Sequence, residues 1–73
     1  MNEKLLITGG NGFIGRYLCR ECNKHGIDFL VLSQDGTCAQ RGGTGFPANL
    51  LDARSLDRAI EYFRPHAVIH LAA

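Results

Sequence analysis

Four glycines near the start of the sequence form a pattern that could bind a phosphate group. Residues 8–15 read TGGNGFIG, in which Gly9, Gly12 and Gly15 lie three residues apart. Counted from Gly10, the same stretch also has the spacing G-x-G-x-x-G. A bound pyrophosphate needs backbone N–H donors and no bulky side chain in its way, which glycines before a helix provide. The stretch therefore predicts a dinucleotide-binding turn, in preference to a tight turn without a ligand.

Strands and helices alternate along the chain on either side of this turn. Such alternation predicts an α/β fold with a parallel sheet. The order β-α-β-β-α-β corresponds to a partial Rossmann-type doubly wound sheet, truncated after the fourth strand. The expected elements are a strand over residues 4–8, a helix over residues 13–25, a strand over residues 27–32, a third strand within residues 45–50, a helix between Asp52 and Pro65, and a strand over residues 67–71. Pro47 cannot donate a backbone hydrogen bond, so the third strand is expected to be short, irregular or at an edge.

The helices have recognisable ends and apolar faces. Gly26 follows the first helix as a C-terminal cap, and Asp52 is the expected N-cap of the second. Apolar residues at intervals of three or four predict the face that each helix buries. The residues expected on these faces are Ile14, Leu18 and Cys22 in the first helix and Leu56, Ile60 and Phe63 in the second.

Composition and charge are those of a small globular domain. The 73 residues are 45% hydrophobic and 21% charged, with a net charge of +1. The basic residues are scattered along the sequence, which argues against nucleic acid or an anionic membrane surface as partners. No apolar stretch approaches the roughly 20 residues of a membrane span, and the run at residues 5–7 is too short for a signal-peptide core. We therefore expect a cytoplasmic protein.

The three cysteines, Cys19, Cys22 and Cys38, are too few and wrongly spaced for a recognisable metal site. Cys19 and Cys22 form a C-x-x-C pair inside the first predicted helix, and a zinc ion would need two further ligands. We interpret the pair as small helix residues, at least one of them packed inward. The odd count also argues against a disulfide framework.

The stretch TGGNGFIG resembles the cofactor loop of the extended short-chain dehydrogenase/reductase family, the NAD-dependent epimerase/dehydratase group. Three later stretches fit the same resemblance. Asn49 and Leu50 resemble the motif that reads the adenine, residues 51–56 resemble the helix start after it, and residues 68–73 resemble the end of the fourth strand. The resemblance is weak only over residues 34–46.

The resemblance implies an NAD or NADP cofactor, a small-molecule substrate such as a nucleotide sugar, and a full-length protein that is often a homodimer. It also implies roles for individual residues in cofactor binding. These are Gly9, Gly12 and Gly15 in shaping the loop, Phe13 and Ile14 as backbone N–H donors to the pyrophosphate, Asn49 and Leu50 at the adenine, and Leu71 and Ala72 along the cofactor.

Two positions depart from the family pattern. Asn49 stands where the family more often has aspartate, and it can accept a hydrogen bond without bringing a charge. Ser33 stands at the end of the second strand, where NAD-binding proteins carry an acid that binds the ribose. The nearest carboxylate is Asp35. Ser33 therefore favours NADP slightly, with Arg16 and Arg41 as candidate phosphate ligands, and the choice between NAD and NADP stays open.

The catalytic pair of the family, Tyr-x-x-x-Lys, is missing from this sequence. The residue four positions after Tyr17 is Glu21, and the residue four after Tyr62 is His66. We assign no catalytic residue. The chain is expected to be the N-terminal part of an NAD(P)-binding domain whose catalytic and substrate-binding parts lie elsewhere. The alternative is a non-catalytic dinucleotide-binding module.

Overall fold

The computed structural model describes residues 3–49 and 51–71, and six elements lie in this part of the chain. They follow the predicted order and begin and end close to the predicted positions. The elements are β1 (Lys4–Thr8), α1 (Phe13–Lys24), β2 (Asp28–Ser33), β3 (Thr44–Pro47), α2 (Ala53–Phe63) and β4 (Ala67–His70). No helix among the described residues is long and apolar enough to cross a bilayer.

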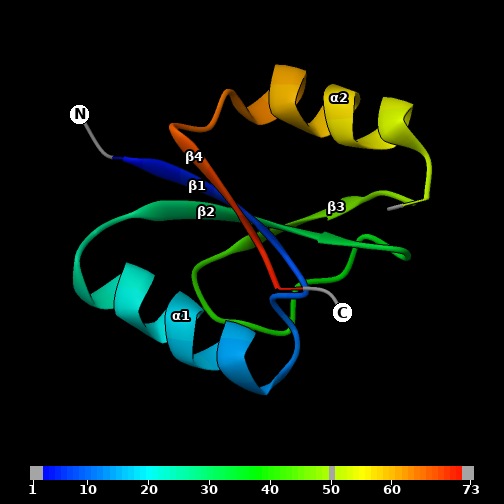
Figure 1. Ribbon diagram of the computed structural model, residues 1–73. Coiled ribbons are helices and arrows are strands. Elements are labelled where there is room, and N and C mark those ends of the chain that lie inside the picture. Colours follow the sequence, from blue (N-terminus) through cyan, green and yellow to red (C-terminus); the bar gives the residue numbers. More distant parts are fainter. Residues whose placement is uncertain (1–2, 50, 72–73) are drawn as a thin grey trace.

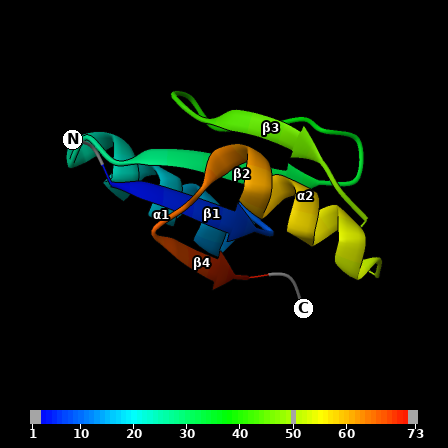
Figure 2. The same cartoon turned by 90° about the horizontal axis from the view of Figure 1, so that it is seen from above.

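The four strands form one parallel sheet in the order β3-β2-β1-β4. Leu6 of β1 pairs with Leu30 of β2 on one side and with Val68 of β4 on the other. Figure 2 shows β3 and β4 at opposite edges of the sheet. This is the strand order of the first half of a doubly wound nucleotide-binding sheet, so the predicted Rossmann-type α/β class is confirmed.

The sheet is covered on both faces, with α1 on one side and α2 on the other (Figure 1). Side chains alternate between the two faces along each strand. Leu6 and Leu30 are fully buried in the cluster under α2, whereas Ile7 and Val31 are fully buried in the cluster under α1. Burial on both faces explains why β1 and β2 are continuous apolar runs.

Two of the three residues predicted on the buried face of α1 are confirmed, because Cys22 is buried and Leu18 packs against the cluster under α1. Ile14 was expected to pack inward, but it is 65% exposed. The buried residues of the helix are Gly15, Cys19 and Cys22. A Cβ atom on Gly15 would lie 2.5 Å from the backbone of Gly10, so these two glycines allow the helix and the turn to pack closely. That contact turns the Gly15 face toward the sheet and leaves Ile14 in solvent.

The second helix follows the prediction more closely. Asp52 caps α2 by accepting a hydrogen bond from the backbone N–H of Arg54 at 3.0 Å. Leu56 and Phe63 pack against the buried cluster, as expected. Ile60 lies at the margin of this face, with 37% of its surface exposed.

Cys19 and Cys22 are both buried free thiols, 1% and 2% exposed, which confirms that they are core residues of α1. Within residues 3–49 and 51–71, no three metal-binding side chains are close enough to hold an ion. Burial, followed by the neighbouring Cys38 and Cys22, raises the pKa of the Cys19 thiol from an ordinary value of 9.0 to about 11.

This raised pKa predicts a loss of stability at alkaline pH. Above pH 9 the unfolded chain releases the Cys19 proton, while the folded chain keeps it until about pH 11. The free energy of unfolding should therefore fall by about 1–2 kcal/mol across this window. Urea unfolding at pH 8 and pH 10.5 measures the fall. In Cys19→Ala the fall should be smaller by that amount, and an equal fall in both proteins would contradict the assignment.

Candidate functional site

The glycine turn joins β1 to α1 at the carboxyl end of a central strand of the sheet. Gly9 has a φ of +76°, a backbone conformation that residues other than glycine rarely adopt. The backbone N–H of Gly12 donates to the carbonyl oxygen of Gly9 at 3.2 Å and closes the turn. The carboxyl ends of parallel strands, where the strand order reverses, are the usual binding sites of this sheet class.

The first turn of α1 has no side-chain cap. Gly12 is the N-cap residue and no acidic residue lies in the first turn. The first intrahelical bond joins the N–H of Arg16 to the carbonyl oxygen of Gly12 at 2.9 Å. The N–H groups of Phe13, Ile14 and Gly15 therefore have no acceptor within the helix. Since α2 is capped by Asp52, this open positive end is a particular feature of α1.

The glycines of the turn have different surroundings. A Cβ on Gly10 would lie 2.9 Å from a methyl carbon of Val31, and a Cβ on Gly15 would collide with Gly10 itself. By contrast, a Cβ on Gly12 would meet only the carbonyl oxygen of Gly9, at 3.6 Å. Gly10 and Gly15 are thus required for packing, whereas Gly12 leaves space beside the open helix end for a ligand.

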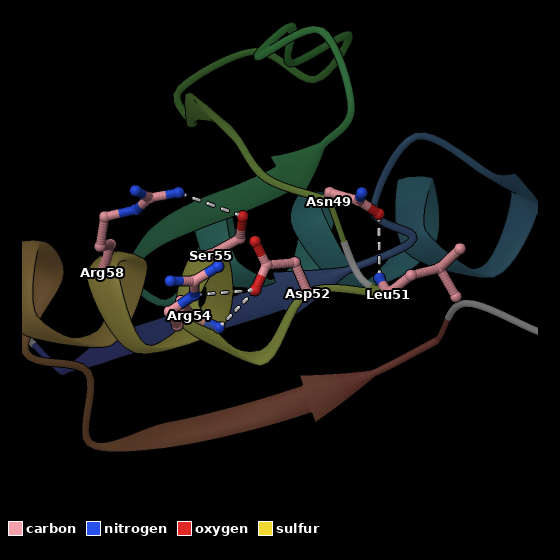
Figure 3. Close-up of polar contacts among 6 residues, drawn as sticks. All are labelled: Asn49, Leu51, Asp52, Arg54, Ser55 and Arg58. Carbon is pink, nitrogen blue, oxygen red and sulfur yellow. Dashed lines mark hydrogen bonds and ion pairs between the residues drawn. The ribbon is translucent and has the colours of Figure 1, made fainter.

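A pocket of about 270 Å³ opens beside the ends of β2 and β3. Its lining residues are Ser33, Gln34, Ala48, Asn49 and Leu51. The side-chain oxygen of Asn49 accepts a hydrogen bond from the N–H of Leu51 at 3.0 Å, as Figure 3 shows. This bond orients the side chain of Asn49, which is one of the lining residues. Leu50, predicted at the same place, lies outside the described residues.

A small hydrogen-bond network follows β2. Asp35 accepts bonds from the hydroxyl of Thr37 at 2.7 Å, from its N–H at 3.1 Å and from the hydroxyl of Ser33 at 3.3 Å. The bonds from Thr37, with the weaker one from Ser33, lower the pKa of Asp35 below its ordinary value. A carboxylate thus reaches Ser33 from two residues away, at the strand end where the sequence itself has no acid.

On the other side of β1, the turn borders the end of β4. The hydroxyl of Thr8 and Nδ1 of His70 lie 2.6 Å apart, and the N–H of Leu71 donates to the carbonyl oxygen of Thr8 at 2.9 Å. Leu71 packs against the buried cluster under α1. Ala72, predicted beside it, lies outside the described residues.

The predicted site residues within the described part of the chain gather at one end of the sheet. Gly9, Gly12, Phe13, Ile14 and Gly15 form the turn and the helix start, while Ser33, Asn49 and Leu71 lie at or just after the ends of β2, β3 and β4. The two tyrosines lie apart from each other, because Tyr17 belongs to α1 and Tyr62 to α2, on opposite faces of the sheet.

Comparisons with known proteins agree with this geometry. The NAD dependent epimerase/dehydratase family matches residues 5–73. Methionine adenosyltransferase 2 subunit beta from Xenopus tropicalis is 35% identical over 97% of the chain, and dTDP-glucose 4,6-dehydratase from Salmonella typhimurium is 33% identical over 96%. UDP-glucose 4-epimerase from Thermus thermophilus, solved in complex with NAD, superposes over 96% of the chain with a TM-score of 0.82 and 34% identity.

These similar proteins are much longer than the chain. It spans 20% of the Xenopus protein, 22% of the Salmonella dehydratase and 24% of the Thermus epimerase. The similarity therefore concerns the β1-α1 turn, the two helices and the four parallel strands, and the remaining three quarters or more of each protein have no counterpart in these residues.

Proposed function

Because this chain belongs to the NAD-dependent epimerase/dehydratase family, we propose that it binds the dinucleotide NAD(P) at the turn between β1 and α1. The observation that carries the proposal is the uncapped start of α1 beside the open space at Gly12. The pyrophosphate would accept hydrogen bonds from the N–H groups of Phe13 and Ile14. Backbone donors and the helix dipole together make such a helix start favourable for a diphosphate.

The adenosine half of the dinucleotide would extend from this turn toward β2 and β3. Ser33 would lie at the ribose, and Asn49 and Leu50 at the adenine. The pocket lined by Ser33 and Asn49 supports this direction, because it opens at the same end of the sheet. Leu71 and Ala72 would border the nicotinamide half of the cofactor. The N–H of Leu71 is hydrogen-bonded to the carbonyl oxygen of Thr8, which directly precedes the turn.

For the choice between the two cofactors we propose a slight preference for NADP. Ser33 supports it, because no carboxylate stands at the position that would repel a 2′-phosphate. The charge of Asp35, two residues further, acts in the opposite direction. Titration of the protein with NADH and with NADPH decides between the two cofactors, and tighter binding of NADH would overturn the preference.

For the whole protein we propose an oxidoreductase of this family acting on a nucleotide sugar or a related substrate. Residues 1–73 would form the N-terminal part of its NAD(P)-binding domain, with catalytic and substrate-binding parts in further chain. The bound cofactor would supply the hydride chemistry, and the protein its position and polarity. The names of the Salmonella dehydratase and the Thermus epimerase support the substrate class. We further propose a cytoplasmic homodimer.

A second candidate is a non-catalytic dinucleotide-binding module. It is favoured by the absence of a Tyr-x-x-x-Lys pair, because Glu21 and His66 stand where the lysine would be needed. The intact mass of the protein in its source cells separates the two candidates. A mass several times 8.0 kDa supports the enzyme, and a mass near 8.0 kDa supports the module.

Cofactor binding itself is tested by thermal unfolding of the protein with and without NADH and NADPH. A ligand at 100 times its dissociation constant stabilises the folded state by about 2.7 kcal/mol. For a domain of this size the melting temperature should rise by roughly 10–20 °C. Adenosine at the same concentration is the control, because it lacks the pyrophosphate and should give a much smaller rise. No rise with either dinucleotide would refute the proposed function.

A further inference from the structure

A second pocket of about 270 Å³ lies beside α1. Its lining residues are Arg16, Arg20 and Arg41, together with Asn23, Gln40 and the buried Cys19. The two ion pairs of the described residues, Lys24 with Glu21 and Arg54 with Asp52, involve none of these three arginines. The lining of the pocket thus includes three arginines that form no ion pair with a carboxylate of the described part.

The loop between β2 and β3 holds one wall of this pocket in place. The side-chain N–H of Asn23 donates to the carbonyl oxygen of Arg41 at 2.6 Å, which fixes the loop against the last turns of α1. Nearer the glycine turn, Asn11 bonds both the carbonyl oxygen of Thr37 at 3.3 Å and the N–H of Ala39 at 2.8 Å. The loop therefore runs from the end of β2, past the glycine turn, to the arginines.

We propose that this pocket binds a phosphate group through Arg16, Arg20 and Arg41. Guanidinium groups bind phosphate oxygens through paired hydrogen bonds, and their charge cannot be lost at neutral pH. The asparagine bonds to the loop set the backbone of Arg41 before a ligand arrives, so less ordering is required on binding. The volume is several times the roughly 30 Å³ that a water molecule occupies in the liquid, which leaves room for a hydrated phosphate.

The phosphate has two possible sources. One is the 2′-phosphate of NADP bound at the glycine turn, in which case the inference rests on the proposed function and gives the NADP preference its ligands. The other is a separate phosphorylated molecule that binds beside the cofactor. Both present the same dianion to the three arginines, and the binding experiment distinguishes them.

The test compares the wild-type protein, Arg41→Gln and the triple variant Arg16→Gln, Arg20→Gln, Arg41→Gln. Binding of NADPH, NADH and inorganic phosphate is measured by calorimetry at low ionic strength, where surface charges are least screened. Arg58→Gln is the matched control, because it removes an arginine from α2 on the opposite face of the sheet. All four substitutions replace exposed side chains, so each should change stability by only about 0.5 kcal/mol or less.

A loss of NADPH affinity of about tenfold in Arg41→Gln and about 100-fold in the triple variant, with NADH unchanged, supports the 2′-phosphate as the source. If both dinucleotides bind all variants alike, but only wild type and Arg58→Gln bind inorganic phosphate, the ligand is a separate phosphate. The proposal is overturned if the triple variant retains every affinity of the wild type. If the wild type binds neither dinucleotide, the proposed function fails, and the phosphate titration alone decides on the pocket.

Discussion

Replacing Gly15 with alanine is expected to destabilise the folded protein severely, and not merely to weaken cofactor binding. The added Cβ would lie 2.5 Å from three backbone atoms of Gly10, which no rotamer change can relieve. Gly10 cannot retreat, because it packs against Val31 and Ile7 of the sheet. The helix and the turn must therefore separate, at a cost of about 3 kcal/mol or more. A domain of this length has only about 4–11 kcal/mol of stability to lose.

Denaturant unfolding followed by circular dichroism measures the effect, and Gly26→Ala provides a matched control. Gly26 follows the same helix with a φ of +67°, and a Cβ there meets nothing within 4 Å. Alanine at this position should cost only about 1 kcal/mol of backbone strain. Equal unfolding midpoints for Gly15→Ala and Gly26→Ala would show that the contact between the helix and the turn does not limit stability.

The elements of the fold could be predicted because their signals are local. Apolar runs marked the central strands, Gly26 marked the end of α1, and Asp52 marked the start of α2. The buried face of α1 could not be predicted in the same way. Ile14 is apolar and correctly spaced, but the face toward the sheet is decided by the fit of Gly15 against Gly10. That fit is a contact between backbones, which hydrophobic periodicity does not record.

The glycine turn and the loop after β2 also differ in how far the sequence alone predicts them. The glycine turn was visible because its chemistry depends on residues close together in sequence. The hydrogen bond from Ser33 to Asp35 and the place of Arg20 beside Arg16 and Arg41 depend on the path of the loop after β2. That path is set by side-chain hydrogen bonds from Asn11 of the glycine turn and from Asn23 of α1. The loop itself has no periodic pattern of apolar residues. Long-range polar contacts of this kind become apparent only in three dimensions.

Gly12→Ala should have the opposite result to Gly15→Ala, with the fold kept and the cofactor lost. The new methyl group meets only the carbonyl oxygen of Gly9, at 3.6 Å, which is an ordinary contact. Stability should therefore change by no more than about 1 kcal/mol, the usual effect of alanine at an N-cap. The methyl group would, however, occupy the space in which the pyrophosphate approaches the N–H groups of Phe13 and Ile14.

Loss of one charge-assisted hydrogen bond to the diphosphate costs about 1.5–3 kcal/mol, so the affinity for NADH and NADPH should fall by roughly 10- to 150-fold. Calorimetric titration of Gly12→Ala measures the fall, and Gly26→Ala, far from the turn, should bind like the wild type. A folded Gly12→Ala protein with unchanged affinity would place the dinucleotide away from this turn. Because the two glycines differ in what a single methyl group meets, together they separate the packing role of the turn from its role in binding.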